Sequence, residues 1–131
     1  GVPVKDISPL EGLPLEWLDL GGTAVADISI LTTCPLLGVD LTGTKVIDFS
    51  PLWKIPSLAR INLDSTGITS LESLRGLPLT WVGLSHTQIA DLSPLYECKK
   101  IACLRIYECQ GLSKEQIGEF KAQCPNCTVE Q

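Results

Sequence analysis

The sequence predicts an α/β solenoid, in which short parallel strands stack into one sheet and short returns run along the opposite side. A skeleton of the form LxxLxLxxTxIxDLSPL begins at Leu79, and copies of it begin at Leu15, Leu36 and Leu58. The copies are spaced by 21 or 22 residues, and the extra residues, Ser57 and Lys100, fall in the connections between copies. Repetition at this period, with insertions confined to one loop, is typical of equivalent coils stacked in register.

The first part of each copy predicts a strand. LxxLxLxx alternates inward leucines with outward variable residues, which is the two-residue period of a short strand. Equivalent strands in successive coils then form a parallel sheet of at least five strands. Its inward pairs are Leu18 and Leu20, Val39 and Leu41, Ile61 and Leu63, Val82 and Leu84, and Leu104 and Ile106.

The second part is a turn that carries a recurring threonine. The members of this column are Thr23, Thr44, Thr66 and Thr87, and Cys109 ends it. Buried backbone groups in such a turn need partners, so we expect each hydroxyl to bond nearby backbone.

The third part is the return. A serine before proline predicts an N-cap followed by proline at the first helical position, at Ser8, Ser50 and Ser93. Prolines also follow four of the returns within a few residues, at Pro14, Pro35, Pro56 and Pro78, so such segments hold only a turn or two of 3₁₀ or α geometry. Recurring aspartates at the start of these returns indicate turn capping in every coil, at Asp6, Asp27, Asp48 and Asp91.

The pattern changes after Cys109. Ser113 begins an SxxQ capping box, and 114–123 has a helical apolar stripe, which predicts a terminal helix that covers the last coil. We therefore expect one domain over 1–131, with a partial repeat at 4–14, repeats at 15–112 and a cap at 113–131. The chain begins within a unit and contains no methionine, which suggests a piece of a larger protein.

The motif LxxLxLxxTxI resembles the leucine-rich repeat, with threonine at the place usually taken by asparagine. The DISPL-type returns look like those of the internalin-like bacterial subclass, and the LPL junctions and the ending FKAQCPNCTV look like repeat regions attached to bacterial serine/threonine kinases. The resemblance implies a right-handed curved solenoid with the sheet on the concave side. It leaves the compartment unknown, with the bacterial cell surface or secretion slightly favoured over the cytoplasm.

Composition excludes several function classes. The net charge is −5 and the pI is about 4.7, so the chain has no basic footprint for nucleic acid or an anionic membrane surface. No apolar run approaches the roughly 20 residues needed to cross a bilayer. We therefore expect a protein or peptide as partner, no nucleic acid and no direct membrane insertion. The uncapped N-terminal edge suggests a homodimer as well.

Outward strand positions form columns across the sheet. Tryptophan, tyrosine and arginine typically anchor interfaces, so the concave face is the expected binding surface. Alternatively, the tryptophans only cover the sheet or stack on arginines, and the acidic column either attracts a basic partner or cation or is simply solvated. The candidate binding residues are Trp17, Asp19, Asp40, Arg60, Asn62, Asp64, Trp81, His86, Arg105 and Tyr107.

Catalytic and metal chemistry find little support. His86, the only histidine, has no serine or cysteine at a recognised spacing, so we predict no catalytic residues, no cofactor and no metal site. Most of the six cysteines are expected to be reduced thiols, although a bridge near the C-terminus is an alternative. Cys124 and Cys127 have CxxC spacing, which is compatible with cap packing, a disulfide, or metal or redox work.

The sequence thus predicts a non-enzymatic protein- or peptide-binding module that uses its concave face. The rival hypothesis is a structural spacer or regulatory segment of a larger multidomain bacterial protein, with no ligand of its own.

Overall fold

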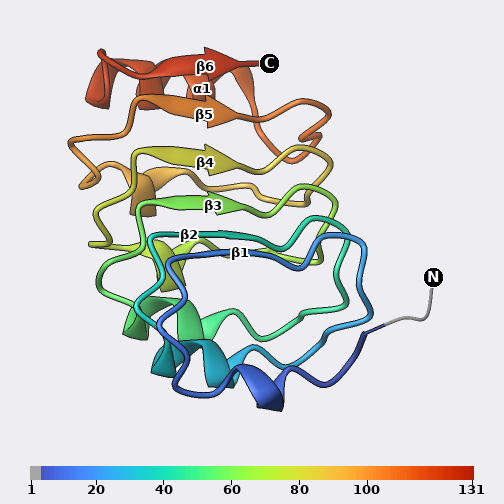
Figure 1. Cartoon of the computed structure of the whole chain (residues 1–131). Helices are drawn as coiled ribbons and strands as arrows, with labels where there is room; N and C mark the ends of the chain where they lie inside the picture. The colour runs from blue at the N-terminus through green and yellow to red at the C-terminus, as the bar shows by residue number, and fades with distance from the viewer. Residues whose placement is uncertain (1–3) are drawn as a thin grey trace.

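The computed structural model describes residues 4–131 as a stack of coils with one six-stranded parallel sheet along its length (Figure 1). The first three residues of the predicted domain lie outside the described part. The strands follow chain order: β1 (Trp17–Asp19), β2 (Gly38–Asp40), β3 (Arg60–Asn62), β4 (Trp81–Gly83), β5 (Cys103–Arg105) and β6 (Thr128–Glu130).

The register of the sheet confirms the repeat alignment. Trp17 pairs with Gly38, Gly38 with Arg60, and Arg60 with Trp81, so equivalent positions of successive coils stand side by side. The inward residues of the central strands are buried. Ile61 and Val82, for example, have no exposed surface. β6 adds a strand beyond the five that repeat, and Thr128 pairs there with Cys103.

The core is a column of leucine-type side chains that runs along the whole stack. Leu36, Leu58 and Leu79, the first residues of successive units, are fully buried. The N-terminal end is less well covered, because Val4 is 46% exposed and Leu13 is 40% exposed. The first coil therefore presents apolar surface at its outer edge in the described part of the chain.

The threonine column bonds backbone as predicted. Each hydroxyl donates to the carbonyl three residues earlier, at 2.7 Å in Thr23, 2.8 Å in Thr44, 2.7 Å in Thr66 and 2.6 Å in Thr87. Cys109 continues the column differently, since its thiol contacts the Leu84 carbonyl of the preceding coil at 2.9 Å. The turn carbonyls thus gain hydrogen-bond partners, and the bonds of Thr44, Thr66 and Thr87 are buried.

The returns are 3₁₀ helices, which lie on the side of the coils opposite the sheet (Figure 1). Their bounds are Ser8–Leu10, Ser29–Thr33, Ser50–Lys54, Glu72–Leu74 and Ser93–Leu95. The prediction of serine N-caps is wrong by one place: the caps are Ile7, Phe49 and Leu92, and the serines are the first helical residues.

The predicted aspartate capping is confirmed. The Oδ1 atoms of Asp6, Asp27 and Asp91 each accept the backbone N–H of the serine two residues later at 2.9 Å, and Asp48 does so at 3.0 Å. In the coil without this aspartate, the Ser70 hydroxyl accepts from Glu72 at 3.2 Å. Because the aspartate supplies the acceptor, the serine moves one place into the helix.

The helix α1 (Lys114–Gln123) closes the C-terminal end of the stack, behind β6 in Figure 1. Its capping box is present: Ser113 Oγ accepts from the Gln116 backbone, and the Gln116 side chain accepts from the Ser113 N–H, both at 3.1 Å. Phe120 is fully buried, and its ring centroid lies 6.4 Å from that of Tyr96. Helix and fold class therefore agree with the sequence prediction. Among the described residues, no helix has the length and apolar character needed to cross a membrane.

Candidate functional site

A groove of about 500 Å³ lies over the first four strands. Six of the predicted binding residues come together in its lining: Trp17, Asp19, Asp40, Arg60, Asn62 and Trp81. The two tryptophans come from the same position of β1 and β4, so two coils separate them. The groove therefore has an aromatic residue at each end, and both come from one column of outward residues.

Trp17 is 60% exposed, and its indole lies on β2 rather than extending freely into solvent. A Cβ placed on Gly38 would be 2.3 Å from Cζ3 and 2.4 Å from Cε3 of the ring. The absence of a side chain at Gly38 thus leaves room for the Cε3–Cζ3 edge of this indole. The sequence pattern alone assigned no role to Gly38.

Trp81 is held by two arginines. The guanidinium carbon of Arg60 lies 5.3 Å from the ring centroid and that of Arg105 lies 5.5 Å away, both within cation–π range. Only one tryptophan of the pair is therefore widely exposed. The alternative interpretation, in which tryptophan stacks on arginine, describes the arrangement of Trp81.

A second column of outward residues closes the turns at the ends of the strands, and its first three members are Asp19, Asp40 and Asn62. The Oδ1 atoms of Asp19 and Asp40 accept the backbone N–H groups of Gly21 and Thr42 at 2.8 Å. Asn62 makes the same bond to the Asp64 N–H at 3.0 Å. Each of these side chains keeps its second polar atom for other contacts, so a structural role leaves capacity for binding.

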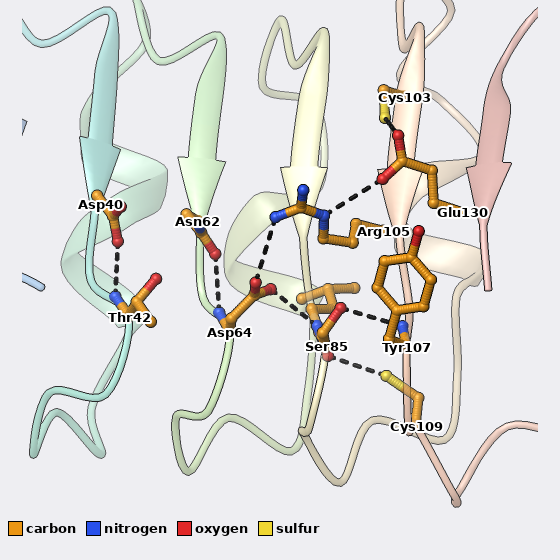
Figure 2. Close-up of polar contacts among 11 residues, drawn as sticks. Asp40, Thr42, Asn62, Asp64, Ser85, Cys103, Arg105, Tyr107, Cys109 and Glu130 are labelled. Carbon is orange, nitrogen blue, oxygen red and sulfur yellow. Dashed lines mark hydrogen bonds and ion pairs between the residues drawn. The ribbon is translucent and has the colours of Figure 1, made fainter.

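A polar network crosses the sheet from β3 to β6 beside the groove (Figure 2). Arg105 lies 3.7 Å from the Asp64 carboxylate and 3.3 Å from that of Glu130, which also accepts from the Cys103 thiol at 3.7 Å. The hydrogen bond that Arg105 donates to Glu130, together with the nearby carboxylates, raises the pKa of Arg105. Asp64 also accepts the Ser85 N–H at 2.9 Å. Sequence reasoning missed Glu130, although its spacing from Thr128 continues the outward alternation.

Four predicted residues lie outside the groove lining: Asp64 and Arg105, which belong to the polar network, and Tyr107 and His86. Tyr107 is 43% exposed, and its backbone N–H donates to Ser85 Oγ at 3.0 Å. His86 is exposed in the turn after β4 and has a φ of 59°. Ser65 and Glu108 have the same left-handed conformation one coil before and one coil after it. The left-handed backbone at His86 is therefore a feature of the turn that neighbouring coils share.

All six cysteines, which lie within the described part of the chain, are free thiols. Burial raises the pKa of Cys127 to about 11 and also raises the pKa values of Cys98, Cys103 and Cys124. These thiols stay protonated at neutral pH, which makes them poor nucleophiles and poor metal ligands. Residues 4–131 contain no group of three or more histidine, cysteine or acidic side chains placed to hold a metal.

Solved bacterial structures share this architecture. Internalin C2 of Listeria monocytogenes is 26% identical, with a TM-score of 0.84 over 97% of this chain and 56% of its own. A second internalin (inlF) of the same species is 22% identical, with a TM-score of 0.74 over 97% of this chain and 44% of its own. A leucine-rich-repeat protein of Leptospira interrogans is 14% identical, with a TM-score of 0.68 over 89% of this chain and 37% of its own.

The chain thus spans about half the length of the two internalins it matches. No protein-family model and no curated protein matches the sequence.

Proposed function

From the internalin-like leucine-rich-repeat fold of this chain, a bacterial fold commonly used for protein binding, we propose that it is a non-enzymatic module that binds a protein or peptide on the concave face of its sheet. The groove over β1 to β4 carries this proposal, because it combines a widely exposed indole with carboxylate and guanidinium groups. Aromatic and arginine side chains supply most of the binding energy in typical interfaces.

Geometry supports the N-terminal half of the groove as the principal contact. Trp17 presents most of its ring to solvent, whereas Trp81 already has two guanidinium partners from its own chain. An exposed, positioned indole loses little side-chain entropy on binding, since its ring already rests against Gly38.

Selection of random linear peptides on the purified chain tests this proposal. The informative variant is Trp17→Ala, and Trp53→Ala is its matched control, because Trp53 is 58% exposed on the return side. We expect Trp17→Ala to weaken the selected peptides by about tenfold or more and Trp53→Ala to leave them unchanged. Equal affinity for wild type and Trp17→Ala would exclude the groove as the binding surface.

The rival function is a spacer or regulatory segment without a ligand. The stacking of Arg60 and Arg105 on Trp81 favours it, since this aromatic residue is satisfied within the chain. Under this hypothesis, selection returns no peptides that depend on the groove, and the loss of Trp81 affects only the free energy of unfolding.

A further inference from the structure

The two ends of the groove differ in how their aromatic residue is partnered. At the C-terminal end the chain supplies a complete set: the Trp81 ring, the Arg105 guanidinium 5.5 Å from its centroid, and the Asp64 carboxylate 3.7 Å from that guanidinium. Glu130 holds the same arginine at 3.3 Å. The guanidinium of Arg105 therefore has both its aromatic partner and its carboxylate partners within the molecule.

At the N-terminal end the ring and the carboxylates are present without a cation. Among residues 4–131, no lysine or arginine lies over the Trp17 ring or within ion-pair distance of Asp19 or Asp40. The nearest arginine of the column, Arg60, stacks on Trp81 instead.

The two carboxylates lie side by side. Their Oδ1 atoms are 3.0 and 3.6 Å from the position that a Cβ on Gly21 would occupy. Each Oδ1 accepts one backbone N–H, which leaves the second oxygen of Asp19 and of Asp40 as acceptors beside the indole. Figure 2 shows the contrast between Asp40, which is joined only to Thr42, and Asp64, which follows the next strand and belongs to the network of Arg105.

We propose that this end of the groove binds an arginine side chain of the protein partner. A guanidinium is planar, so it stacks on an indole while its five N–H donors point outward in the guanidinium plane toward neighbouring carboxylates. The net charge of −5 favours a cationic partner as well. This inference rests on the proposed binding function and adds the chemistry of the ligand. A metal ion is a weaker candidate, because two carboxylates form no complete ligand set.

The test uses random linear peptides selected on the wild-type chain, together with versions in which each arginine is replaced by citrulline. Citrulline keeps the planar shape and removes the charge. The informative protein is the double variant Asp19→Asn, Asp40→Asn. Asparagine keeps the oxygen that closes the turn, as Asn62 does at the equivalent place of β3. Its control is Glu11→Gln, Glu119→Gln, which removes the same charge from exposed residues outside the groove lining.

We expect the selected peptides to contain arginine and to bind at least about tenfold more tightly than their citrulline versions. In the double aspartate variant this preference disappears, and in the glutamate control it persists. Peptides that depend on Trp17 but bind equally well with citrulline would overturn the arginine site and leave the proposed binding function intact. A selection without any peptide that depends on Trp17 would overturn both.

Discussion

The indole of Trp17 lies against the backbone of Gly38 on the neighbouring strand, so close that a Cβ on Gly38 would come within 2.3 Å of the ring. The Gly38→Ala variant should therefore displace the ring. Because a surface side chain can swing away, the loss of stability should be small. The NMR signal of the Trp17 indole N–H reports the displacement, and peptide affinity should fall with it. Gly67→Ala is the control, since its nearest neighbour would be 4.0 Å away. An unshifted Trp17 signal in Gly38→Ala would contradict this contact.

A left-handed backbone residue recurs at the same place in every coil. It is glycine at Gly22 and Gly43, with φ of 72° and 67°, and serine at Ser65, with φ of 56°. A Cβ on Gly43 meets nothing within 4 Å, so only backbone strain opposes a side chain there. We expect Gly43→Ala to lower the free energy of unfolding by about 1 kcal/mol and Ser65→Gly to raise it by less. Urea denaturation measures both changes, and a shift of the same sign in the two variants would refute the argument.

The hydroxyl of Thr66 is buried and bonds the Leu63 carbonyl at 2.7 Å. The Thr66→Val variant keeps the shape but leaves this carbonyl without its partner, which should cost about 1 to 3 kcal/mol. Thr23→Val removes the equivalent bond in a half-exposed turn, where water replaces it, and should cost less. Thermal unfolding of the two variants compares the costs, and a larger loss in Thr23→Val would contradict the role of burial.

The aspartates that cap the returns predict sensitivity to acid. The backbone N–H and then the hydroxyl of the following serine lower the pKa of Asp6, Asp27 and Asp91 below 3.8, and the Ser50 hydroxyl and N–H do the same for Asp48. A carboxyl group whose pKa is lower in the folded state than in the unfolded chain contributes its full stabilisation at pH values above its unfolded-state pKa. This stabilisation is lost as the pH falls through the folded pKa. Urea midpoints should therefore drop below about pH 4. Variants with asparagine at these positions should show a weaker dependence of the urea midpoint on pH. A dependence as steep as that of the wild type would count against the capping.

The exposed apolar edge of the first coil predicts self-association. Leu13 is 40% exposed there, beside the half-buried Leu15 and Leu18. We propose that two copies meet through this edge, so that the sedimentation coefficient rises with protein concentration. Leu13→Lys should shift the equilibrium toward monomer, whereas Ile47→Lys, at a residue that is 84% exposed elsewhere, should not. Sedimentation that is independent of concentration would exclude the dimer.

The periodic part of the molecule could be predicted from sequence because each coil repeats the same requirements. The alignment of Trp17 with Gly38, Arg60 and Trp81 follows from spacing alone, and the sheet has this register. Local capping was harder to predict, because serine and aspartate compete for one role. The distance between Asp6 Oδ1 and Ser8 N shows that the aspartate takes it.

Contacts between side chains on neighbouring strands could not be predicted, because they depend on rotamers. The sequence places Arg60 next to both Gly38 and Trp81, and only the structure shows that it turns toward Trp81. The same holds for Glu130, which reaches Arg105 from a strand outside the repeat. The distinction between a satisfied and an open end of the groove arises entirely from these side-chain directions.

The two tryptophans lie at equivalent places of coils that are separated by two others, so the number of coils sets the distance between them. Duplicating one coil between Trp17 and Trp81 would move these residues about 4.8 Å further apart without altering either end. Evolution or design can therefore tune the length of ligand that touches both indoles in whole-coil steps.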